Sequence, residues 1–92
     1  MIARHETILS RGIVGFQAEI IQSSDPTLHG MVGTIVFETK NMIFIRSGSI
    51  VRRIAKMAAK RLRLQTAYCA CFISGSALIG RPEDRISRLN NE

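Results

Sequence analysis

The chain has 92 residues, of which 46% are hydrophobic, and it contains only seven Gly and two Pro. This composition is that of a globular protein rather than a disordered tail, and a chain this short has room for one hydrophobic core. Thirteen Lys and Arg against seven Asp and Glu give a formal net charge of +6. A surplus of this size attracts polyanions such as RNA, DNA or an anionic membrane surface.

Export and membrane insertion are not expected. The residues that follow Met1 are too polar for the apolar segment of a signal peptide, and no apolar run approaches the roughly 20 residues that span a bilayer. The sequence therefore predicts a cytoplasmic protein that does not bind membranes and keeps its thiols reduced.

The two cysteines do not have the spacing of a metal site. Cys69 and Cys71 are separated by one residue, whereas zinc sites usually place about two to four residues between paired cysteines. His5 and His29, the remaining candidate ligands, lie in separate polar segments. Apolar packing is the expected role of both cysteines, and we expect the protein to bind no metal or cofactor of its own.

The amino-terminal part of the chain predicts a strand followed by a loop. Residues 1–12 are polar enough for a short helix or a frayed end. Alternating apolar and polar side chains, with several β-branched residues, predict a strand over 13–22. Residues 23–30 then contain Ser, Asp and Pro, which bond locally to the backbone or fix its angle, and they predict a loop.

The centre of the chain predicts a hairpin. Strands are expected over 31–38 and 42–46, because β-branched and aromatic residues dominate both. Thr39-Lys40-Asn41 between them is short enough for a tight turn, and Asn tolerates the positive φ that such turns use. A second turn is expected at Ser47-Gly48-Ser49.

Residues 50–64 fit two structures. Ile50, Ile54 and Met57 recur at helical spacing, and the alanines of this stretch favour helix. Leu62 and Leu64 instead follow the period of two that is typical of a strand. Propensity does not decide between the two structures, whereas residues 67–73 are a clear strand candidate.

The carboxy-terminal residues predict a short helix. In Arg81-Pro82-Glu83-Asp84-Arg85, proline suits the first helical position and the two acidic residues face the positive end of the helix dipole. Short strands joined by tight turns, with helical ends, suggest a small antiparallel barrel.

Two segments, taken together, resemble the archaeal ribonuclease P protein component 1 family. Residues 23–41 contain a serine-bearing loop, a Gly-x-x-Gly at 30–33, a strand and then Glu-Thr-Lys-Asn at a hairpin, as that family does. Residues 75–85 resemble the family's carboxy-terminal signature. Ile13-Val14-Gly15 resembles its Leu-Ile-Gly, so the resemblance extends over about residues 13–88. One departure is Ala55, which stands where the family usually has proline.

The resemblance implies a mainly β fold. The expected structure is a small, strongly bent antiparallel Sm-like barrel over about residues 13–80, in a single domain of residues 1–92. Short helical extensions are expected at 1–12 and 81–92. The resemblance also favours strands on either side of Lys56, although Ala55 leaves a helix permitted there.

The chemistry of a nuclease acting alone is not predicted. Such an enzyme needs clustered carboxylates for metal ions or a His pair for acid–base work. Glu83 and Asp84 form the only adjacent acidic pair, and consecutive helical positions point apart. Glu38 at the hairpin is expected to pair with a neighbouring basic residue or a turn N–H. No catalytic residue is predicted.

Basic residues instead predict RNA binding. The cations between 52 and 63 would spread over one side of a barrel, and a second group follows the last strand. The predicted RNA-binding residues are Lys40, Asn41, Arg52, Arg53, Lys56, Lys60, Arg81 and Arg85. The aromatic residues Phe37, Phe44, Tyr68 and Phe72 are spaced as core residues, so no stacking platform for bases is expected.

By resemblance, the protein is expected to be a non-catalytic subunit of ribonuclease P. In that enzyme a catalytic RNA, using magnesium ions that it binds itself, removes the 5′ leader from precursor tRNA. The subunit would bind this RNA and pair with a zinc-ribbon protein subunit. The apolar candidates for that protein contact are Ile2, Ile8, Leu9, Ile86 and Leu89.

Three alternatives stay open. One is an Sm-like RNA chaperone outside ribonuclease P that assembles into a ring. Another is a basic amphipathic module that docks to membranes or proteins through residues 50–64. The third is a stand-alone nuclease.

Overall fold

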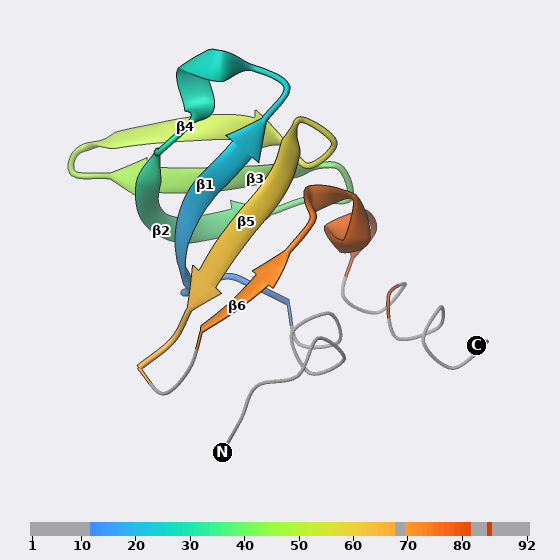
Figure 1. Cartoon of the computed structure of the whole chain (residues 1–92). Coiled ribbons are helices and arrows are strands. Elements are labelled where there is room, and N and C mark those ends of the chain that lie inside the picture. Colours follow the sequence, from blue (N-terminus) through green and yellow to red (C-terminus); the bar gives the residue numbers. More distant parts are fainter. Residues whose placement is uncertain (1–11, 68–69, 82–84, 86–92) are drawn as a thin grey trace.

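The computed structural model of the chain describes residues 12–67, 70–81 and 85. Within these residues six strands form one antiparallel sheet in the order β4-β3-β2-β1-β5-β6 (Figure 1). The strands are β1 (Gln17–Ser23), β2 (Val32–Glu38), β3 (Met42–Ser47), β4 (Ile50–Ala55), β5 (Ala59–Gln65) and β6 (Ala70–Ile73). Two short 3₁₀ helices follow β1 and β6, namely η1 (Pro26–Leu28) and η2 (Gly75–Leu78). The mainly β fold predicted from the sequence is confirmed.

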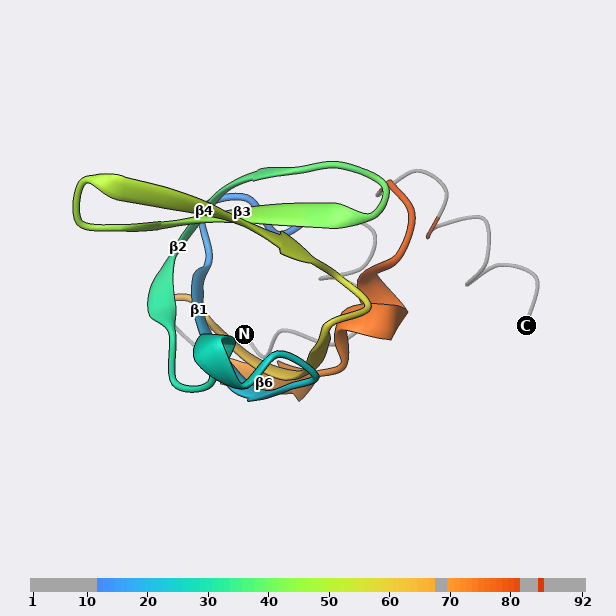
Figure 2. The same cartoon turned by 90° about the horizontal axis from the view of Figure 1, so that it is seen from above.

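The sheet bends so that β3 and β4 lie across from β5 and β6 (Figure 2). Strands β4 and β6 are the two outer strands, and no pairing among the described residues joins them. The described sheet is therefore open, and the closed barrel expected from the sequence is not seen in it. The terminal helices expected at 1–12 and 81–92 fall almost wholly outside the described residues.

Both predicted tight turns are confirmed in position, but Asn41 does not adopt the positive φ expected of it, since only glycines among the described residues do so. The β2–β3 hairpin turns at Thr39, whose N–H donates to the carbonyl of Met42 at 2.9 Å and whose hydroxyl accepts from the Met42 N–H at 3.1 Å. The β3–β4 hairpin turns at Gly48, whose φ of +63° lies in the left-handed region that glycine adopts without strain.

Residues 50–64 form two strands, β4 and β5, on either side of Lys56. Ile54 in β4 pairs with Ile43 in β3, and Leu62 in β5 pairs with Ile20 in β1. The alternative of a basic amphipathic helix is therefore wrong. Hydrogen bonding to β3 and β1 and burial of Ile54, Leu62 and Leu64 outweigh a helix preference of a few tenths of a kcal/mol per residue.

The core lies inside the bend of the sheet. It is made mainly of side chains at alternate positions of the strands, and Ile13, Leu28 and Leu78 pack on it from outside the strands. Its buried apolar residues are Ile13, Ala18, Ile20, Leu28, Ile35, Ile43, Ile45, Ile54, Ala59, Leu62, Leu64, Ile73 and Leu78. Cys71 is half-buried against this core, as predicted, and Cys69 lies outside the described residues.

Candidate nucleic-acid interface

Glu38, the last residue of β2, points into the fold because β2 contains a bulge. The register shifts between Ile35 and Phe37, so that Phe37 pairs with Phe44 and Glu38 pairs with Ile43. An extra residue in one strand reverses the face to which the following side chains point. The bulge therefore turns Phe37 outward and directs Glu38 to the same side as Ile43, which is fully buried.

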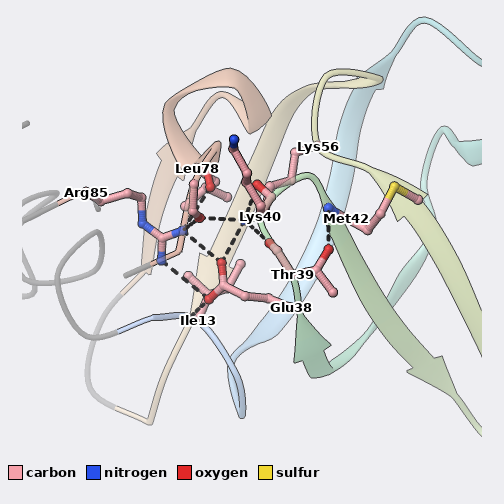
Figure 3. A network of polar contacts seen from close by, with 9 residues as sticks. Ile13, Glu38, Thr39, Lys40, Met42, Lys56, Leu78 and Arg85 are labelled. Carbon is pink, nitrogen blue, oxygen red and sulfur yellow. Dashed lines mark hydrogen bonds and ion pairs between the residues drawn. The ribbon is translucent and has the colours of Figure 1, made fainter. Parts of the chain in front are cut away.

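The carboxylate of Glu38 binds two buried cations (Figure 3). Lys56 Nζ lies 2.9 Å from Oε1, and Arg85 Nη1 lies 2.8 Å from the same oxygen. The second oxygen, Oε2, accepts a hydrogen bond from the backbone N–H of Ile13 at 3.2 Å. The side chains of Lys56 and Arg85 are 0% exposed and that of Glu38 is 5% exposed. Water is thus excluded from all three charges.

Backbone carbonyl oxygens complete the surroundings of both cations. Lys56 Nζ lies 2.7 Å from the carbonyl oxygen of Thr39 and 3.1 Å from that of Gly80. Arg85 Nη1 lies 2.6 Å from the Gly80 oxygen and 2.8 Å from the Leu78 oxygen. These carbonyl dipoles replace part of the hydration that the two buried cations have lost. We call Glu38, Lys56 and Arg85 with these carbonyls the buried ionic network.

The pKa of Glu38 lies below its ordinary value of 4.5. Burial raises this pKa, but hydrogen bonds from Arg85 and Lys56, together with the two positive charges, outweigh burial.

This lowered pKa predicts acid sensitivity. A carboxyl group whose pKa is lower in the folded protein stabilises the fold above its unfolded pKa, and the contribution is lost as pH falls through the folded value. We expect the free energy of unfolding to decrease as the pH drops below about 4.5, and to decrease less in Glu38→Gln. Urea denaturation at a series of pH values measures this, and parallel pH profiles for the two proteins would contradict it.

Two predicted RNA-binding residues are part of this network, and their expected surface position is wrong. The Lys56 and Arg85 side chains have no surface from which to contact an RNA partner. Glu38 does pair with basic residues, although these are not its neighbours in the sequence, and it also accepts a hydrogen bond from the N–H of Ile13. Its partners lie 18 and 47 residues away in the sequence, so local spacing could not have identified them.

The network brings the β2–β3 turn and the start of the carboxy-terminal segment together. The N–H of Gly80 donates to the carbonyl of Lys40 at 2.8 Å, and the N–H of Lys56 donates to that of Asn41 at 2.8 Å. Lys40, Asn41 and Arg81 are all exposed, and we call them the hairpin-tip cluster. Three of the predicted RNA-binding residues thus lie close together, although Arg81 is distant in sequence from the other two.

The remaining predicted cations are exposed but do not share one face. Arg52 pairs with Ile45, a core residue, whereas Arg53 pairs with Phe44 on the opposite face of β3. Lys60 is exposed at the start of β5. The prediction that all the cations between 52 and 63 spread over one side is therefore wrong, because adjacent residues of a strand point to opposite faces.

The surroundings of two further arginines, Arg46 and Arg63, were not predicted from the sequence. Arg46 in β3 is exposed. Ile43 and Ile45 alternate along this strand and are buried, so the sequence pattern could have predicted that Arg46 points to the solvent. Arg63 in β5 is already paired, since its Nη2 lies 2.9 Å from Oε1 of Glu19. Its charge is therefore partly neutralised within the protein.

The expected burial of the aromatic residues is wrong at two positions. Phe37 is 55% exposed and Phe72 is 47% exposed, while Phe44 is half-buried and Tyr68 lies outside the described residues. The bulge in β2 accounts for Phe37, whose ring centroid lies 5.5 Å from that of Phe44. Phe72 faces outward because its strand neighbours pair with inward-facing leucines of β5.

Neither a metal cluster nor a membrane span is found in the part of the chain that the structure describes. No group of three or more His, Cys, Asp or Glu side chains there lies close enough to hold a metal ion. No helix among those residues is long and apolar enough to cross a bilayer.

Comparison with known proteins identifies one family. The family described as Ribonuclease P/MRP, subunit p29, matches residues 6–88. A Methanococcus aeolicus protein named Ribonuclease P protein component 1 is 34% identical over 84 residues, which cover 88% of this chain and 85% of the relative. A Desulfurococcus amylolyticus protein of the same name is 34% identical over 90 residues, covering 97% and 91%.

A solved structure gives the same result. It is described as that of Mth11, a homologue of the human RNase P protein Rpp29, and it matches with a TM-score of 0.61 and 28% identity. The match covers 83% of this chain and 99% of the solved chain. The residues matched by the family span the positions of Glu38, Lys56 and Arg85.

Proposed function

Because this chain belongs to the ribonuclease P/MRP subunit p29 family and is a protein subunit of ribonuclease P, we propose that it binds the catalytic RNA of that enzyme. The holoenzyme is an endoribonuclease. The protein supports the RNA in removing the 5′ leader from precursor tRNA and contributes no catalytic group of its own.

The observation that carries this proposal is the uncompensated charge on the surface. Lys40, Arg52, Arg53, Lys60 and Arg81 are exposed. Among the described residues none of the five takes part in an ion pair, whereas Lys56, Arg63 and Arg85 do. Hydrogen bonds from Thr27 lower the pKa of the Asp25 carboxyl group, and of the five cations Arg52 lies near enough to help lower it. Cations that face solvent outside ion pairs can exchange their counterions for RNA phosphates, which is the main source of RNA affinity in proteins.

The mechanism is electrostatic. Phosphate groups of different RNA segments repel one another, and cations supplied by the protein reduce that repulsion, so that the active RNA fold needs less magnesium. Asn41 in the hairpin-tip cluster offers an amide to a base edge or a 2′-hydroxyl. The magnesium ions of the reaction are bound by RNA, and the protein needs no cofactor.

The proposal includes a zinc-ribbon protein subunit as partner, bound through Ile2, Ile8, Leu9, Ile86 and Leu89. These residues lie outside the described part of the chain. Their flanking residues support the idea, because the Ile13 N–H and the Arg85 guanidinium both contact the carboxylate of Glu38. Both terminal segments therefore start at one place in the fold. We also propose that the chain forms a single domain and that this domain is a closed Sm-like barrel. The proposed location of the protein is the cytoplasm.

Charge neutralisation tests RNA binding. We expect a Lys40→Gln, Arg53→Gln, Arg81→Gln variant to bind the catalytic RNA more weakly. The slope of log affinity against log salt should become shallower by roughly 0.7–0.9 for each phosphate that the variant no longer neutralises. Filter binding at several salt concentrations measures both. Arg63→Gln is the matched control and should change little, because Arg63 is already paired with Glu19. An unchanged slope in the triple variant would contradict the proposed interface.

A further inference from the structure

Phe72 lies on the outer face of β6, one of the two outer strands of the sheet. Cys71 and Ile73 beside it pair with Leu64 and Leu62, which face the core, so the ring of Phe72 points away from the core. Its exposed fraction is 47%. The guanidinium carbon of Arg61, in the adjacent strand β5, lies 4.9 Å from the ring centroid, which is cation–π distance.

A shallow hollow surrounds this ring. Its volume is about 290 Å³, and its lining residues are Lys60, Arg61, Phe72, Ile73 and Ser74. Lys60 and Arg61 make no ion pair within the described residues, whereas Arg63, further along the same strand, is paired with Glu19. The hollow thus combines a half-exposed aromatic ring with two cations that make no ion pair within the described residues.

The surroundings of Phe72 differ from those of an ordinary exposed apolar residue. Single exposed hydrophobic side chains are common and need no partner. A protein-docking surface would surround the ring with further apolar area and place few charges at its centre. Among the residues that line the hollow, the cations Lys60 and Arg61 border Phe72, and cations also border the aromatic residues on which proteins stack unpaired bases.

We propose that Phe72, Arg61 and Lys60 form a subsite for one unpaired RNA nucleotide. The base stacks against the exposed surface of the Phe72 ring, Arg61 keeps the ring in place, and Lys60 and Arg61 face the adjoining phosphate. Stacking accepts any base, so the subsite selects unpaired over paired nucleotides rather than a sequence. The inference rests on the proposed RNA binding and adds a base-stacking site that the sequence pattern did not predict.

Two leucine variants of the full chain test the subsite. Phe72→Leu removes the ring and keeps an apolar side chain. Phe37→Leu is the matched control, because Phe37 is 55% exposed and no cation lies over its ring within the described residues. The probes are a short unstructured oligoribonucleotide carrying a fluorescent purine analogue and a base-paired RNA of equal length. Fluorescence anisotropy gives affinity, and quenching of the analogue reports stacking.

For Phe72→Leu we expect about five- to one-hundred-fold weaker binding of the unpaired RNA and loss of quenching. The salt dependence should be unchanged, because the substitution removes no cation that faces a phosphate, and binding of the paired RNA should be unchanged. Phe37→Leu should match the wild type. Thermal melting of each variant establishes that it is folded.

The other outcomes separate the two proposals. Equal affinity and quenching in Phe72→Leu and wild type would overturn the subsite while leaving the cationic interface intact. If Phe72→Leu weakens association with the zinc-ribbon protein and not with RNA, the surface docks protein and the subsite is also overturned. If the wild type binds neither probe at low salt, the proposed RNA binding itself fails.

Discussion

Replacing Glu38 with Gln is expected to lower the free energy of unfolding by about 3–5 kcal/mol, because it removes the negative charge with which two buried cations pair. Lys56 and Arg85 are both 0% exposed in their side chains, and both pair with this carboxylate. The amide that replaces it is nearly the same size, so the loss reports charge rather than a cavity. Urea denaturation followed by circular dichroism measures the change.

Glu19→Gln is the matched control for this variant. It breaks an ion pair of the same 2.9 Å length with Arg63, but those side chains are 31% and 36% exposed. Exposed pairs contribute about 0–1 kcal/mol. A similar loss in Glu38→Gln and Glu19→Gln would show that burial adds nothing to the network.

A second variant keeps the test informative if Glu38→Gln does not fold. Adding Lys56→Met to it removes one of the two buried cations that pair with Glu38 and replaces it with an apolar side chain of similar length. We expect part of the lost stability to return, since removing a buried charge together with its partner costs less than removing the partner alone. No recovery would mean that Arg85 or the carbonyl dipoles dominate the network.

Replacing Gly75 with Ala is expected to cost about 1–3 kcal/mol or more, because the first residue of η2 has no room for a Cβ atom. A Cβ there would lie 1.9 Å from the carbonyl oxygen of Lys56 and 2.5 Å from that of Ala59. Both are backbone atoms at the β4–β5 connection, so the backbone itself must move. That movement would also disturb the chain that carries the Lys56 side chain into the buried ionic network.

Thermal melting measures this effect. For a chain of this size a loss of 1 kcal/mol lowers the melting temperature by roughly 4–8 °C. Ser76→Ala, at the exposed neighbouring position, is the control and should stay within about 0.5 kcal/mol of the wild type. Equal melting temperatures for Gly75→Ala and Ser76→Ala would show that η2 shifts away from β5 without cost.

The strands and turns were largely predictable from local pattern. Alternating side chains located β2 and β3, and the short polar segment at Lys40 together with Gly48 located their turns. These signals are local because a strand's period and a turn's backbone angles depend on adjacent residues. The local pattern of residues 50–64 fits both a helix and strands. Pairing with the neighbouring strands β3 and β1 stabilises the two strands β4 and β5 instead of a helix.

The sequence identified the basic residues of the candidate site, but it did not show which of them are buried. Lys40, Asn41 and Arg81 are exposed as predicted, since polar residues at turns and chain ends stay in water. Lys56 and Arg85 have the same residue types and are buried. Nothing in the residues beside them differs enough to show this, because the acid that holds both belongs to β2.

The order of the amino acids is enough to specify a basic, mainly β protein and to carry the motifs of its family. Which of its charges face solvent depends on the folded chain. The bulge before Phe37 directs Glu38 inward, and this one carboxylate then draws two cations out of the basic surface. Long-range strand pairing and burial determine which basic side chains face solvent, and neither can be inferred from the spacing of neighbouring residues.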